Sequence, residues 1–167
     1  MYTTIKDFLD SFTDVSQKTI QIFDSLSDES LAQEIAPGFR NIGRISWHIV
    51  QTIPEMMERT ELKISGPSDE EEVPSTSKEI LDTYMQVAKE LVEVVQKEWK
   101  DETLRIEDDM YGEKWSRAKT CLCLIEHQIH HLGQITVLMR QANLPVPGIC
   151  GPSKEEWQQF GMPPPKI

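Results

Sequence analysis

The sequence predicts an all-α protein, a four-helix bundle with short additional helices. Apolar residues recur at three- and four-residue steps in four long segments, and no segment shows a convincing strand alternation. A long polar connection separates the second segment from the third. Amphipathic helices bury their apolar stripes against one another, which favours an antiparallel bundle. The 167 residues fit one domain, residues 1–167.

The first two helical segments lie in the N-terminal third of the chain. The first is expected from about Thr4 to Leu26, and a short helix from Ser27 to Ile35 precedes Pro37-Gly38. The second long helix begins near Asn41. Pro54 lies inside it and is expected to kink it beyond His48.

Residues Leu62 to Thr76 form the polar connection. Thr76 with Glu79 resembles a capping box and opens a third helix that ends near Trp99. The stretch from Asp101 to Trp115 is expected to be irregular. Its acidic residues do not form a calcium loop, because Tyr111 and Ala118 occupy positions where oxygen ligands are required.

The fourth helix is expected from about Ser116 to Ala142, followed by Asn143-Leu144-Pro145. Residues 148–167 form a C-terminal extension that we expect to pack on the bundle. Within it, the pattern Ser153-x-x-Glu156 predicts a last short helix.

Composition excludes several classes of function. The 17 basic and 28 acidic residues give a net charge of −11 without a basic cluster, so no nucleic-acid partner is expected. The chain has neither a signal-peptide pattern nor a long apolar run, which predicts a cytoplasmic protein without a membrane partner. Three cysteines, an odd number without C-x-x-C spacing, favour a reduced compartment.

All four histidines lie in two predicted helices, at His48 and at His127, His130 and His131. His127 and His131 are four residues apart, so their rings point to the same side of one helix. His130 falls in a neighbouring, more polar row. His48, from a separate helix, would complete three protein ligands to a metal with a position left open. The alternative is a set of interior histidines with separate hydrogen-bond partners.

Other metal motifs do not fit. A zinc protease needs H-E-x-x-H, but Gln128 stands where the glutamate is required. A di-iron bundle needs Glu-x-x-His, but Ile129 follows Glu126 at that spacing. Cys123 shares the face of His127, and we interpret it as a small buried residue rather than a fourth ligand.

His48, the sequence H-x-x-H-H-x-G-Q at 127–134 and Leu144-Pro145 together resemble the DinB family of metal-binding four-helix bundles, also described as YfiT-like metal-dependent hydrolases. The resemblance covers nearly the whole chain. It implies an up-down-down-up bundle, whose parallel second and third helices need the long crossover at Leu62 to Thr76. It also implies zinc or nickel bound by His48, His127 and His131.

The same resemblance implies chemistry at the metal. The family is similar to enzymes that use bacillithiol or related low-molecular-weight thiols, so we expect a thiol S-transferase or a hydrolase with a small-molecule substrate, and a homodimer. Many members of the family have an arginine at the position that Leu132 occupies here, so this chain differs from them at that position.

Two carboxylates are candidates to support the ligand histidines. A non-catalytic function also remains an alternative to the enzyme. Glu55 and Glu126 are candidates to orient a ligand histidine, although Glu55 is better interpreted as a solvated surface residue. The alternative to an enzyme is a non-catalytic metal-binding module of the stress response. Recruitment of Cys123 or His130 as a fourth ligand would favour that alternative.

Overall fold

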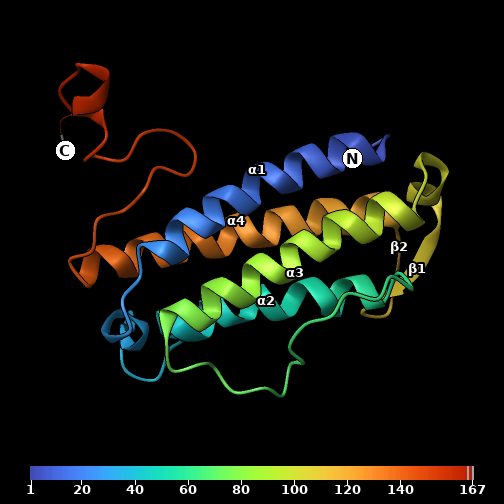
Figure 1. Cartoon of the computed structure of the whole chain (residues 1–167), viewed down its shortest axis with the longest axis horizontal. Helices are drawn as coiled ribbons and strands as arrows, with labels where there is room; N and C mark the ends of the chain where they lie inside the picture. Colours follow the sequence, from blue (N-terminus) through green and yellow to red (C-terminus); the bar gives the residue numbers. More distant parts are fainter. Residues whose placement is uncertain (165, 167) are drawn as a thin grey trace.

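The computed structural model describes residues 1–164 and 166, and four α-helices form its body. In chain order the helices are α1 Ile5–Asp24, α2 Ile42–Glu58, α3 Ser77–Glu98 and α4 Arg117–Gln141. In Figure 1, α1 runs in one direction, α2 and α3 run in the other, and α4 returns in the direction of α1. The predicted up-down-down-up bundle is confirmed.

Each helix packs against two others. α1 and α2 both contact α3 and α4, so α1 and α2 occupy opposite corners of the bundle. The crossover from Arg59 to Thr76 travels back along the bundle before α3 begins (Figure 1). The fully buried amide of Gln51 donates to the carbonyls of Ser68 and Glu71, which fixes this crossover against α2. One core fills the space between the helices, and its fully buried side chains include Phe8, Phe12, Ile49, Ile53, Tyr84 and Leu91.

Side-chain caps define where the long helices begin. Thr4, Asn41, Thr76 and Ser116 each accept a hydrogen bond from the backbone N–H three residues later. Such a cap stabilises a helix by about 1 kcal/mol. The predicted starts of the second, third and fourth helices are therefore confirmed. α2 continues through Pro54 to Glu58 as one helix.

In the described part of the chain, three short 3₁₀-helices accompany the bundle: η1 Glu29–Ala32, η2 Asp101–Arg105 and η3 Trp157–Phe160. Among the helices of the described residues, none is both long enough and apolar enough to cross a membrane.

A β-hairpin corrects the prediction that no strand is present. β1 Glu107–Met110 pairs with β2 Glu113–Ser116, and Tyr111 and Gly112 connect them with φ values of 61° and 87°. A two-residue turn with both φ values positive matches the twist of a hairpin. The strands are short and mostly charged, and tyrosine is unusual at the first turn position, so the sequence pattern gave no strand signal.

The C-terminal extension begins along α4. Val146 is buried, and Arg140 of α4 forms an ion pair with Glu155. Half of the predicted capping box is present: Ser153 N–H donates to the Glu156 carboxylate over 2.9 Å, but the Ser153 hydroxyl has no hydrogen-bond partner among the described residues, and the short helix begins only at Trp157. The η3 segment buries no side chain and lies apart from the four helices in Figure 1. Residues 165 and 167 of the extension lie outside the described part of the chain, and packing of the whole extension on the bundle stays a prediction.

Candidate metal centre

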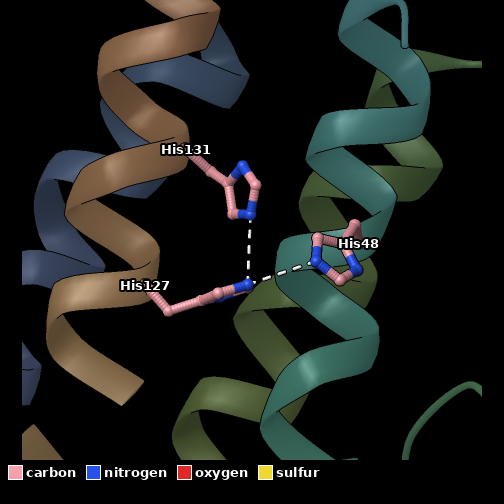
Figure 2. A group of neighbouring side chains, drawn as sticks. All are labelled: His48, His127 and His131. Carbon is pink, nitrogen blue, oxygen red and sulfur yellow. Dashed lines mark hydrogen bonds between the residues drawn. The ribbon is translucent and has the colours of Figure 1, made fainter. Parts of the chain in front are cut away.

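The three histidines predicted as ligands meet between two neighbouring antiparallel helices. His48 lies on α2, and His127 and His131 lie one turn apart on α4. Figure 2 shows the three rings turned toward a common point between the helices. One nitrogen from each ring lies within 4.8 Å of the other two, and the described residues contribute no carboxylate or thiol to this group.

The spacing of the nitrogens fits a small cation. His127 Nε2 lies 3.2 Å from His48 Nε2 and 3.1 Å from His131 Nε2. A tetrahedral zinc ion with Zn–N bonds of about 2.0–2.1 Å would separate its ligand nitrogens by roughly 3.3 Å. The three side chains are therefore arranged for facial coordination, with the remaining positions open.

Gln134 fixes the orientation of one ligand. Its Oε1 lies 2.8 Å from His131 Nδ1, and its Nε2 lies 3.0 Å from His130 Nε2. Because an amide oxygen can only accept, His131 Nδ1 carries the proton and its Nε2 keeps a free lone pair. Hydrogen bonding of the second ring nitrogen is the usual support of a metal-bound histidine.

The two contacts of His127 Nε2 cannot both be ordinary hydrogen bonds, whereas a cation would satisfy both. His127 Nε2 faces two imidazole nitrogens, but a single ring nitrogen has one proton or one lone pair for this purpose. Its Nδ1 is buried and has no hydrogen-bond partner among the described residues. If all three Nε2 lone pairs coordinate a metal, the contacts at Nε2 become favourable. The residues present therefore fit the metal.

The environment keeps the three imidazoles neutral. Burial, assisted by the neighbouring histidine charges, lowers the pKa of His48 and of His127 to about 4. Burial also lowers the pKa of His131, although its hydrogen bond with Gln134 opposes this shift. A neutral imidazole is the form that binds metal, so the site needs no deprotonation near neutral pH.

A pocket of about 670 Å³ borders the cluster through His131. Gln134 and His130 on α4 line it, together with Phe39 and Arg40 from the segment before α2. A volume of this size suits a small organic ligand. The cluster therefore has a substrate-sized space on one side.

The other candidates lie outside the group of three. Glu55 accepts hydrogen bonds from Tyr111 and Arg59, both over 2.7 Å, and Glu126 is exposed on α4. The structure gives neither carboxylate a hydrogen bond to a histidine. Cys123 is partly buried and packs against the core.

His130 is exposed, as its polar row predicted, and its described partner is the amide of Gln134. Gln134 was not among the residues predicted to support a ligand histidine. The available signal was its position three residues after His131, on the same side of the helix.

The structure is a four-helix bundle in which three histidines from two helices converge and could hold a metal ion. The DinB family model matches residues 1–166, and the chain belongs to the DinB family.

Two relatives support this membership, and a third protein shares the fold. The uncharacterized protein YrdA of Bacillus subtilis strain 168 is 40% identical over 167 residues, all of both chains. A DinB-like protein of Bacillus cereus ATCC 10987 has a crystal structure that matches with a TM-score of 0.87 at 46% identity, over 89% of this chain and 99% of that one. The DinB-like protein YjoA of Bacillus subtilis, 19% identical, matches with a TM-score of 0.66 over 83% of this chain and 96% of its own.

Proposed function

We propose that this protein is a metal-dependent enzyme that activates a low-molecular-weight thiol, or water, for reaction with a small electrophile. The main observation in support is the geometry of three neutral imidazoles, one of which, His131, lines a pocket of about 670 Å³. Three protein ligands with open positions are typical of catalytic rather than structural metal sites. Zinc or nickel is the proposed metal, because imidazole nitrogen suits both ions.

The protein residues would bind the metal and orient its ligands, and the metal would act as a Lewis acid. A bound divalent cation lowers the pKa of a coordinated thiol or water, which makes the nucleophile available near neutral pH. His48, His127 and His131 would hold that cation from one side. Gln134 would keep the ring of His131 in place through its Nδ1 proton.

A transferase assay tests this proposal. Chelator-treated protein is reloaded with zinc or nickel and incubated with an aryl halide such as chlorodinitrobenzene and a panel of thiols that includes bacillithiol. We expect thiol adducts to form only with metal-loaded protein. A variant with His48→Ala serves as the matched control and should lose this activity.

Hydrolysis is measured in parallel with nitrophenyl esters and anilides. If neither thiol transfer nor hydrolysis depends on the metal, the proposal is wrong. In that case the protein would instead be a non-catalytic metal-binding module.

A further inference from the structure

The pocket beside the metal centre has an uncovered apolar wall. Ile35, Phe39 and Val137 line it, and their side chains are 53%, 66% and 52% exposed. Ile45 and Leu138, both buried, form its deeper part. Large apolar side chains gathered around a concave site are typical of ligand pockets, since a ligand removes them from water.

Arg40 places one permanent positive charge on the wall of this pocket. Its guanidinium has no ion pair or hydrogen bond with any described residue. Arg59, Arg117 and Arg140 each bind a carboxylate of the chain. Arg44 and Arg105, like Arg40, have no ion pair with a described residue, but of these three only Arg40 lines the pocket. In a protein with 28 acidic residues, a guanidinium left without a carboxylate is available for an external anion.

The charge of Arg40 acts close to the metal centre. Arg40 lines the same pocket as His131, one of the three clustered histidines. Leu132, by contrast, is fully buried in the core, so that position of α4 supplies no cation to the pocket. Arg40, in the segment before α2, supplies the positive charge instead.

We propose that the pocket binds a small amphipathic carboxylate, with Arg40 pairing with the carboxylate and the side chains of Ile35, Phe39 and Val137 covering the apolar body. A guanidinium matches one carboxylate through two parallel hydrogen bonds, which favours a single anionic group on the ligand. This inference names the substrate class of the proposed function and rests on it for the reaction. Binding itself requires no metal and can be measured separately.

Calorimetric titration of the full chain, first freed of metal with chelator, tests the pocket. The probes are phenylbutyrate and its neutral amide, which share the apolar body and differ in charge. We expect the carboxylate to bind about tenfold more tightly than the amide, as one charge-assisted pair predicts. Arg40→Gln should remove this preference and leave binding of the amide unchanged.

Arg44→Gln is the matched control. Arg44 lies one turn further along the chain, donates to Gln51 and does not line the pocket, so this variant should keep the preference. Because Arg40 is exposed and unpaired among the described residues, its replacement should leave the circular dichroism spectrum unchanged.

Three results would overturn the inference: no binding of either probe, equal binding of both, or an undiminished preference in Arg40→Gln. If carboxylate binding is retained without any metal-dependent turnover, the proposed enzyme function fails and the ligand class stands.

Discussion

The Nε2 atoms of His48 and His127 lie 3.2 Å apart, although 79 positions separate the two residues in the chain. The contact exists because α2 and α4 are antiparallel neighbours in the bundle. His131, one turn from His127, adds the third nitrogen at 3.1 Å. Two helices therefore bring together three imidazole nitrogens that could hold a metal ion, and several consequences can be measured.

Replacement of a ligand should abolish tight metal binding. We expect the wild-type protein to bind one divalent ion per chain and the His127→Ala variant to lose on the order of 100-fold or more in affinity, because ligand loss should exceed the 10–100-fold effect of a supporting residue. Elemental analysis and chelator competition measure this. His130→Ala is the matched control on the same helix and should retain the metal. Full occupancy in His127→Ala would contradict the assignment of the three ligands.

The support of His131 by Gln134 should be visible in metal affinity. Gln134→Ala removes the acceptor of the Nδ1 proton and should weaken metal binding about 10–100-fold. Gln134→Glu keeps an acceptor oxygen at the same place. Its metal affinity should be at least about tenfold higher than that of Gln134→Ala. The measurement is competition with a chromogenic chelator. Equal affinities of the two variants would show that the hydrogen bond has no role in binding.

The metal-free protein should lose stability as the pH falls from about 6.5 to about 4. In the folded state the pKa of His48 and of His127 is lowered to about 4, from 6.5 in the absence of burial. Between these values the unfolded chain binds more protons than the folded chain, so acid favours unfolding, and above about pH 6.5 the effect levels off.

Urea unfolding at about pH 7.5 and about pH 5 measures this dependence. A variant with His48→Gln and His127→Gln provides the comparison and should show a weaker dependence on pH. An equal dependence in the two proteins would mean that other groups cause the loss of stability.

Gln128→Glu would complete the H-E-x-x-H sequence from His127 to His131, yet it should not produce a zinc protease. Gln128 is fully buried and accepts a hydrogen bond of 2.8 Å from the hydroxyl of Tyr84, on the core side of α4. A carboxylate there should destabilise the fold by roughly 3 kcal/mol or more at neutral pH.

Denaturant unfolding and a peptide hydrolysis assay measure the two effects of this substitution. Glu126→Gln, an exposed change two residues away, is the control and should alter the stability by less than about 0.5 kcal/mol. If Gln128→Glu keeps the stability of the wild type and hydrolyses peptides, the placement of residue 128 on the buried core side of α4 is wrong.

Local sequence patterns were sufficient to predict the four long helices, but not η2, which lies in the stretch expected to be irregular. The spacing of apolar residues and the caps at Asn41, Thr76 and Ser116 locate three helix starts, because these signals act within one or two turns. The hairpin was not predicted. Its stability comes from contacts that the local pattern does not show, such as the ion pair between Asp108 of β1 and Arg117 at the start of α4.

The sequence by itself determined which histidines could share a face, since the i, i+4 spacing of His127 and His131 on a helix is fixed by 3.6 residues per turn. Only the tertiary structure decided that His48 reaches them, that Gln134 rather than Glu55 or Glu126 hydrogen-bonds a ligand, and that Arg40 stands on the pocket wall. The His48 contact joins two helices, and Arg40 reaches the pocket from a loop, so both depend on how the elements pack, which no local spacing specifies. Gln134 and His131 lie three residues apart on one helix, a spacing that permits their hydrogen bond without specifying it.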